Sequence, residues 1–240
     1  MTDQTPPVTP AETMATAPLD DASVLAVLSR ASTAAVSDVL DMLGYDNGLL
    51  GIRPLQAGHR VCGPAYTVRF EPVAAGEPAP AADYIEDVPA GHVVLLANDG
   101  RTWCTVWGDI LSAIAKTRGI AGTVIDGACR DATEIMAIGY PLFSLTAYMK
   151  SGKNRVKMTG AQVPVTAGGA RVEPGDWLVG DDSGVVVVPA ARRAEVAALV
   201  QEVEAMEARV IADVRAGIPL AEARRRQGYN RFALKVEAPR

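Results

Sequence analysis

Residues 108–138 read GDILSAIAKTRGIAGTVIDGACRDATEIMAI, and this stretch decides the fold. Residues 108–118 carry apolar side chains at helical spacing, and Gly119 is a typical helix end. The run 121–125 (AGTVI) is short and carries no charged residue, and it is predicted as a strand buried in the sheet. After the loop 126–131, a second helix is predicted over 132–138. Helix, strand, loop and helix in close succession predict an α/β domain, in which ligands bind at the carboxyl ends of strands.

Further strands are predicted on both sides of this stretch. Residues 61–70 alternate apolar and polar side chains, and 92–97 (HVVLLA) form another fully apolar run, which the turn residues 98–100 would end. Residues 71–82, rich in proline, alanine and glycine, are expected to form a surface loop. The other predicted strands are 141–145, the 163–172 region interrupted by two glycines, and a hairpin of 177–180 with 185–188.

Helices are predicted near both ends of the chain. Asp20 or Asp21 can cap a first helix, and Ser32 or Thr33 a second. A long helix is expected over 190–216, with an apolar stripe of Val196, Leu199, Val200, Val203, Met206, Val210, Ile211 and Val214. The predicted organisation is a disordered tail at 1–20, a single domain at 21–216 and a C-terminal extension at 217–240.

The composition narrows the class of function. The 240 residues are 49% hydrophobic and carry a formal net charge of -5, which favours a small-molecule ligand over nucleic acid or an anionic membrane. The N-terminus lacks the features of a secretory signal, and no apolar run approaches the roughly 20 residues of a membrane helix. Three widely spaced cysteines indicate neither a disulfide framework nor a zinc cluster. We therefore expect a cytoplasmic protein.

Four charged residues gather at the junction between the predicted strand 121–125 and the following helix: Asp126, Arg130, Asp131 and Glu134. Crowded carboxylates repel one another, and a divalent cation or a basic partner relieves the repulsion. Magnesium fits, because it prefers one or two protein carboxylates and keeps several waters. A structural interpretation stays open as well: Asp131 can cap the helix, with Glu134 in capping-box register.

Residues Gly108, Asp109, Ile110 and Leu111 begin the other predicted helix, where free backbone amides can bind an anion such as a carboxylate. An ordinary helix start with an exposed Asp109 is the alternative. A basic stretch is a second candidate for dicarboxylate binding, or else a solvated loop: Lys150, Lys153, Asn154, Arg155 and Lys157.

Other catalytic groups are scarce. The only histidines, His59 and His92, lie beside glycines near strand starts and are interpreted as structural, which leaves little material for a catalytic triad. Cys129 adjoins Arg130, which would lower its pKa, but a small buried side chain is the more usual interpretation, and no role is assigned to it.

Several motifs together resemble the RraA-like family. They are VSDVLDMLG (36–44), VCGPAYTV (61–68), WGDILSAIAKTRGIAGTVIDGACRDATEI (107–135), GYPLF (139–143) and VPVTAGGARVEPGDWLVGDDSGVVVVP (163–189). The similarity extends over about residues 24–214. It implies an α/β fold related to the swivelling phosphohistidine domain, with added N-terminal helices and a long C-terminal helix. It also implies assembly as a homotrimer or as a hexamer of paired trimers.

The resemblance implies a lyase. Aldolase members of the family cleave 4-hydroxy-4-methyl-2-oxoglutarate or 4-carboxy-4-hydroxy-2-oxoadipate to pyruvate and a second oxo acid, decarboxylate oxaloacetate, and require magnesium or manganese. By resemblance, Asp131 ligates the metal, Arg130 holds pyruvate and its enolate, and the amides of 108–111 bind the substrate carboxylate. Asp109, where glutamate is more frequent in the family, and Glu134 would orient metal-bound waters.

Two points stay open within the resemblance. The family also uses a glutamate from the C-terminal helix of a neighbouring subunit, and no motif chooses among Glu195, Glu202, Glu204 and Glu207. Other members inhibit ribonuclease E by protein contact, so a non-catalytic regulator is the alternative function. The extra helices and the arginine–aspartate pair favour the enzyme. A methyltransferase is disfavoured because no glycine-rich nucleotide loop follows a first strand.

Overall fold

The computed structural model describes residues 19–74 and 76–231, so nearly all of the predicted tail lies outside the described residues. The helices are α1 (Asp21–Leu28), α2 (Thr33–Met42), α3 (Asp109–Thr117), α4 (Ala132–Ile138), α5 (Arg193–Arg215) and α6 (Leu220–Gln227), with short 3-10 turns at Ile85–Asp87, Ala190–Arg192 and Tyr229–Arg231. The strands are β1 (Arg53–Pro54), β2 (Val61–Pro72), β3 (Val93–Trp107), β4 (Gly122–Cys129), β5 (Leu142–Ala147), β6 (Val156–Ala161), β7 (Val165–Ala167), β8 (Ala170–Val172), β9 (Trp177–Asp181) and β10 (Gly184–Val188).

The main sheet is mixed, with the order β1-β5-β4-β3-β2-β9-β10 and with β6 paired to β2. Strands β2 to β5 are parallel to one another, as is typical of an α/β arrangement, whereas β9 and β10 form the predicted antiparallel hairpin. The long strand β2 joins the two parts, since its first residues pair with β9 and its later residues with β3 and β6. The predicted α/β fold is confirmed.

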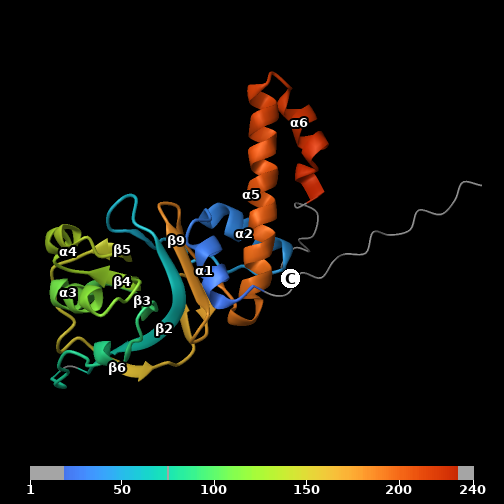
Figure 1. The fold of residues 1–240 in the computed structure, drawn as a ribbon. Coiled ribbons are helices and arrows are strands. Elements are labelled where there is room, and N and C mark those ends of the chain that lie inside the picture. The colour runs from blue at the N-terminus through green and yellow to red at the C-terminus, as the bar shows by residue number, and fades with distance from the viewer. Residues whose placement is uncertain (1–18, 75, 232–240) are drawn as a thin grey trace, which may run out of the picture.

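The core divides into layers because the parallel strands bury both faces. Val94 and Leu96 of β3 pack in the cluster that includes α3 and α4. Val93 and Leu95 point the other way and pack with β9 and β10. A third cluster lies between that hairpin and α1, α2 and α5. Figure 1 shows this division, with α3 and α4 on one side of the curved β2 and with α1, α2 and α5 on the other.

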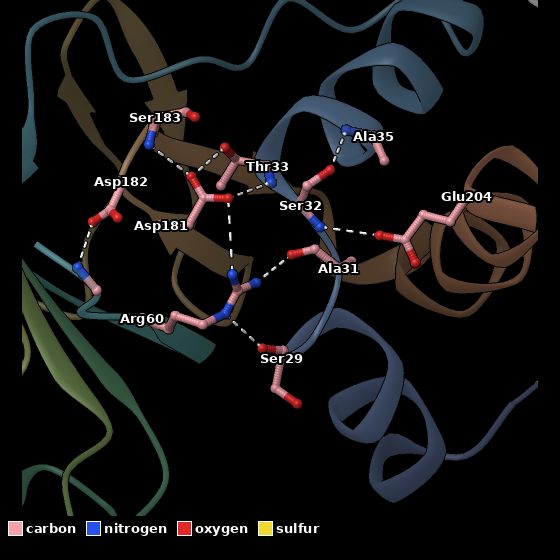
Figure 2. A network of polar contacts seen from close by, with 11 residues as sticks. Ser29, Ala31, Ser32, Thr33, Ala35, Arg60, Asp181, Asp182, Ser183 and Glu204 are labelled. Atoms are coloured by element: carbon pink, nitrogen blue, oxygen red, sulfur yellow. Dashed lines mark hydrogen bonds and ion pairs between the residues drawn. The ribbon is translucent and has the colours of Figure 1, made fainter. Parts of the chain in front are cut away.

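The N-terminal helices form where the capping residues predict. Asp20 accepts a hydrogen bond from the Ser23 amide at 2.9 Å, and the Ser32 hydroxyl accepts one from the Ala35 amide at 3.1 Å. A polar network ties the turn between α1 and α2 to the sheet (Figure 2). Arg60 donates to the carbonyl oxygens of Ser29 and Ala31.

The centre of that network is Asp181 at the end of β9. Its carboxylate accepts hydrogen bonds from the Thr33 amide at 2.9 Å and the Thr33 hydroxyl at 2.7 Å, and one from the Ser183 amide at 2.8 Å. Burial acts to raise the pKa of Asp181, but these hydrogen bonds and Arg60 outweigh burial and leave the pKa below its usual value. The start of α2 is therefore held by a charge on the sheet.

Several predictions of local structure were wrong. The strand predicted to end at Ala97 continues to Trp107, because Asp99 and Gly100 take left-handed backbone and shift the pairing with β4 without ending it. The basic stretch, for which a solvated loop was one interpretation, lies outside the helices and strands up to Arg155, whereas Lys157 lies in β6, a strand that was not predicted. Ile211 and Val214, placed in the buried stripe of α5, are 50% and 41% exposed.

The C-terminal end of the described chain is a helical hairpin. Ala223 of α6 packs against Met206 and Val210 of α5 in a small separate cluster. Both helices project away from the sheets (Figure 1). The predicted boundary between the domain and the extension stays a prediction.

Within residues 19–74 and 76–231, no single helix has the length and apolar character to cross a membrane. Helices α1 and α2 pass that test only when counted together, and they meet at a bend of 119°.

Candidate active site

A cavity of about 450 Å³ opens where β3 and β4 end, within the 300–1,000 Å³ range typical of small-molecule sites. Four segments supply most of its wall: residues 80–86, 105–111, 130–131 and 151–153. Because β3 and β4 are parallel neighbours, the residues after Trp107 and after Cys129 meet at one edge of the sheet. The Arg130 amide donates a hydrogen bond to the Trp107 carbonyl oxygen at 3.0 Å, which joins the two loops.

The predicted residues Gly108, Asp109, Ile110, Leu111, Arg130 and Asp131 all line this cavity. The close approach of the two loops depends on Gly108. A Cβ atom at this position would lie 2.6 Å from Asp131 Oδ2 and 3.3 Å from Arg130 Cγ. Any side chain at residue 108 would therefore displace the Asp131 carboxylate.

The Asp131 carboxylate does not cap α4, so the capping-box interpretation was wrong. Asp131 lies in the left-handed region (φ 58°, ψ 41°) and its side chain makes no capping hydrogen bond. This backbone costs on the order of 1 kcal/mol for a residue other than glycine, and such strain concentrates at functional sites. The conformation turns the carboxylate away from the helix and toward Arg130 and the amide of Asp109.

The pairing of Arg130 with Asp131 leaves most of the guanidinium free. Arg130 Nε lies 3.1 Å from each Asp131 carboxylate oxygen. Within the described residues, neither Nη atom of Arg130 has a hydrogen-bond or ion-pair partner, and the side chain is 43% exposed. Two planar, permanently charged donors thus stay available for an anionic ligand.

The turn at the start of α3 already binds carboxylate oxygens. The Asp109 amide donates to Asp131 Oδ2 at 3.4 Å, and the Ile110 amide donates to Asp109 Oδ1 at 2.8 Å. These two side chains occupy the amides that the resemblance assigns to a substrate carboxylate. The geometry of the turn therefore suits a carboxylate ligand.

Trp107 positions this turn, a role that the sequence did not indicate. Its indole Nε1 donates to the buried Ser112 hydroxyl at 2.7 Å, and that hydroxyl donates to the Gly108 carbonyl oxygen at 3.1 Å. The indole also stacks on Tyr140, with ring centroids 6.1 Å apart. The sequence feature that could have indicated this role is a tryptophan directly before a glycine at the end of a strand.

Two residues of the predicted acidic group lie outside the cavity. Strand β4 continues to Cys129, so Asp126 lies within the strand, buried, and accepts a hydrogen bond from the Gly100 amide at 3.1 Å. Burial raises the pKa of Asp126. Glu134 is exposed on α4 and does not line the cavity, although the prediction gave it a role beside the metal.

The donor set of the cavity fits a magnesium or manganese ion that keeps most of its waters. Asp109 and Asp131 both line the cavity, and the Asp131 carboxylate accepts a hydrogen bond from the Asp109 amide. Among the described residues, no group of three or more histidine, cysteine, aspartate or glutamate side chains could hold a metal. Magnesium needs only one or two protein carboxylates when waters and a chelating ligand supply the rest.

The remaining wall comes from segments with weak sequence signals. Residues 80–86 belong partly to the predicted surface loop, and they include Tyr84, whose hydroxyl is buried without a partner among the described residues. Of the predicted basic stretch, Lys153 is the member that lines the cavity, beside Ser151 and Gly152. Neither histidine lines the cavity, and burial raises the pKa of the Cys129 thiol, which argues against a nucleophile.

A comparison with known families decides the relationship. Residues 33–187, well over half of the chain, match the model of the family described as "RraA-like: Aldolase/RraA". The chain belongs to the RraA-like family. The matched range contains the cavity residues from Gly108 to Leu111, Arg130 and Asp131, together with the whole main sheet except the last residue of β10.

Three relatives show what this RraA-like chain is similar to. Protein DlpA of Legionella pneumophila is 38% identical over 220 residues, which are 91% of this chain but 36% of DlpA, so the chain spans about a third of that relative. A Halalkalibacterium halodurans protein named "Putative 4-hydroxy-4-methyl-2-oxoglutarate aldolase" is 35% identical over 65% of this chain and 72% of its own length. The crystal structure of Streptomyces coelicolor RraAS2, described as an unusual member of the RNase ES inhibitor RraA family, matches with a TM-score of 0.74 at 31% identity, over 81% of this chain and 98% of that one.

Proposed function

We propose that this chain is a divalent-metal-dependent carbon–carbon lyase. It cleaves a 4-hydroxy-2-oxo diacid to pyruvate and a second oxo acid, and it decarboxylates oxaloacetate as a side reaction. The observation that carries the proposal is the pairing of Arg130 with Asp131 beside the amides of 108–111 in one cavity. The aldolase name of the Halalkalibacterium relative supports it.

The chain's own residues divide the reaction between them. The α3 turn and the two free Nη groups of Arg130 bind and orient the 2-oxo acid end of the substrate. Asp131 would hold the cation, and Asp109 lies beside it to orient water. When bound, magnesium or manganese supplies Lewis-acid stabilisation of negative charge on the 2-oxo acid.

Cleavage breaks the bond between carbons 3 and 4 of the substrate. The 4-hydroxyl gives its proton to a water molecule in the cavity and carbon 4 becomes a carbonyl, while the electron pair of the broken bond moves onto the three-carbon fragment. Arg130 stabilises this charge, because its guanidinium is fixed by Asp131 and stays protonated. Carbon 3 then takes up a proton through water oriented by Asp109, and pyruvate leaves.

The direct test is release of pyruvate by the purified chain, followed with lactate dehydrogenase and NADH. We expect turnover of 4-hydroxy-4-methyl-2-oxoglutarate with added magnesium or manganese and none above background in excess chelator. A blank without protein corrects for spontaneous loss of carbon dioxide from oxaloacetate. Activity that persists in chelator would disprove metal dependence.

A second candidate is a regulator that binds a ribonuclease, because the RraAS2 structure is described within a family of RNase inhibitors. Inactivity on every 4-hydroxy-2-oxo acid and on oxaloacetate, with tight binding to a ribonuclease of the same host, would favour this function over the lyase.

We also propose a homotrimer or a hexamer, following the family resemblance. The exposed Ile211 and Val214, near the C-terminal end of α5, support a subunit contact there. Light scattering of the full chain tests this assembly, and a monomer at micromolar concentration would contradict it.

A further inference from the structure

We propose that Lys153 binds the second carboxylate of the substrate and thereby selects diacids over monoacids. This inference rests on the proposed function and adds to it a residue that sets substrate class. Residues 151–153 are distant in sequence from the loops at 108–111 and 130–131, but they line the same cavity as Arg130.

The loop that carries Lys153 is fixed to the edge of β3. The amide and the hydroxyl of Thr105 both donate to the Lys150 carbonyl oxygen, at 3.0 and 3.1 Å. Gly152 lies so close to β3 that a Cβ atom there would be 2.5 Å from the Thr105 carbonyl oxygen. The backbone of 150–152 is therefore held in place by the strand that leads into the catalytic turn.

The same loop is also fixed to the segment that forms another part of the wall. The Asn154 amide donates to the Ala79 carbonyl oxygen, and the Ala79 amide donates to Asn154 Oδ1, both at 2.8 Å. Asn154 adopts left-handed backbone (φ 58°), which asparagine tolerates better than most residues. These two hydrogen bonds fix the position of Asn154, so the backbone of the neighbouring Lys153 is held at the cavity wall.

The ammonium group of Lys153 stays free. Lys157 pairs with Glu77 at 2.6 Å, and Arg155 donates to the Ser151 and Lys153 carbonyl oxygens. Across residues 19–74 and 76–231, Lys153 has no ion-pair partner, and its side chain is exposed. Lys150 likewise forms no ion pair within these residues, but it does not line the cavity. Lys153 is thus the cation of this stretch that can meet a ligand in the cavity.

The spacing along β3 suits a short diacid. Thr105 holds the Lys153 loop, and Trp107 accepts the hydrogen bond from the Arg130 amide. Residues two apart on a strand are separated by about 7 Å. The two anchoring points are therefore separated by a distance comparable to the length of a short dicarboxylate.

The charge of the cavity makes a second cation necessary for such a ligand. Its lining residues include four acidic ones, Asp83, Glu86, Asp109 and Asp131, and the two basic ones Arg130 and Lys153. Four carboxylates repel a dianion, and Arg130 with the metal ion neutralises only the 2-oxo acid end. Lys153 is then the cation that compensates the negative charge of the distal carboxylate. A monoacid, which lacks that carboxylate, gains nothing from Lys153.

The test compares Lys153→Met with the matched control Lys150→Met in the full chain with magnesium. Pyruvate release is measured from 4-hydroxy-4-methyl-2-oxoglutarate, a diacid, and from 4-hydroxy-2-oxopentanoate, a monoacid. We expect Lys153→Met to lower kcat/KM for the diacid about tenfold, mainly through a higher KM, and to leave the monoacid within twofold. Lys150→Met should change neither value. An unchanged ratio of diacid to monoacid in Lys153→Met would overturn the proposal.

A binding measurement separates this proposal from the proposed lyase activity. Titration calorimetry with 2-oxoglutarate and 2-oxobutanoate, in the presence of magnesium, requires no turnover. If the wild-type chain releases no pyruvate, tighter binding of the diacid that is lost only in Lys153→Met still supports the role of Lys153. Equal affinity of both acids for the wild type, or no binding of either, would reject it.

Discussion

Two arginine–aspartate pairs in this molecule have similar chemistry and opposite surroundings. At the turn between α1 and α2, Arg60 and Asp181 direct nearly all their polar atoms at backbone groups of the protein (Figure 2). At the end of β4, Arg130 donates to Asp131 through Nε alone, and this arginine lines the cavity with neither Nη group hydrogen-bonded to any of the described residues. A pair whose hydrogen bonds are used up stabilises the fold, whereas one that keeps donors free is available to a ligand.

The comparison predicts that each pair affects a different property. The largest effect is expected from Asp131→Asn, which keeps the shape of the side chain and a residue type that tolerates left-handed backbone. It removes the charge that orients Arg130 and that, in the proposed function, holds the cation. We expect turnover to fall by about 10³-fold or more, as for loss of a charge-stabilising group.

The stability of this variant should change little, since Asp131 does not cap α4. Pyruvate release and thermal unfolding are measured in parallel, with Glu134→Gln as the control. Glu134 is exposed on the same helix and lies outside the cavity. A Glu134→Gln variant as inactive as Asp131→Asn would show that the active carboxylates have been misassigned.

Gly108→Ala sharpens the comparison at the same pair without altering any charge. Its Cβ atom would lie 2.6 Å from Asp131 Oδ2, so the carboxylate must leave its present position beside Arg130. The backbone itself is extended and accepts alanine (φ −151°). We expect a loss of about 10²-fold in kcat/KM, because a displaced catalytic group loses its alignment with the substrate. Normal activity with alanine at residue 108 would show that the close approach is unnecessary.

The sequence predicted the elements better than it predicted which side chains meet. Apolar runs and caps located β3, β4, α2 and α3, because burial and capping are local properties. The acidic group was only half right. Strand β4 extends past its apolar run, so Asp126 faces the protein interior, and the left-handed backbone of Asp131 has no sequence signature outside glycine.

Contacts between distant segments were beyond the reach of sequence patterns. Lys153 lines the same cavity as Arg130 only because Thr105 and Trp107 hold the two loops along one strand. Similarly, Trp107 acts through Ser112, and nothing in the spacing of those residues distinguishes a hydrogen bond from ordinary packing. The resemblance to a family supplied the roles of Arg130 and Asp131, and the structure supplies their geometry.

Asp181→Ala tests the structural pair. It removes the acceptor of three hydrogen bonds and leaves Arg60 without its carboxylate, so we expect the free energy of unfolding to fall by about 2–3 kcal/mol. Turnover per folded molecule should be unchanged, since Asp181 does not line the catalytic cavity. Urea denaturation measures the free energy of unfolding. Pyruvate release, divided by the titrated amount of active protein, measures turnover per folded molecule.

The contribution of Asp181 should also depend on pH. The pKa of Asp181 is lowered in the folded chain, so its contribution is fully present above the unfolded pKa of about 4 and is lost as pH falls through the folded value. The difference in stability between wild type and Asp181→Ala should therefore shrink below about pH 4. The difference between wild type and Asp181→Ala removes the contributions of the other carboxylates to the pH dependence of stability. These include Asp126, whose raised pKa has the opposite effect on that dependence.

The smallest effect is expected from Glu204 on α5, which belongs to the structural network although the family resemblance made it a candidate for a neighbouring active site. Glu204 Oε1 accepts a hydrogen bond from the Ser32 amide at 3.1 Å and so ties α5 to the start of α2 (Figure 2). Glu204→Ala should cost about 1 kcal/mol in the free energy of unfolding, while Glu204→Gln keeps an acceptor oxygen and should cost less. Glu202→Ala, exposed on the same helix, is the control. Because Glu204 joins α5 to α2 within its own chain, turnover per folded molecule should stay constant in all three variants. Loss of turnover at full stability in the Glu204 variants would place this carboxylate with Asp131 instead.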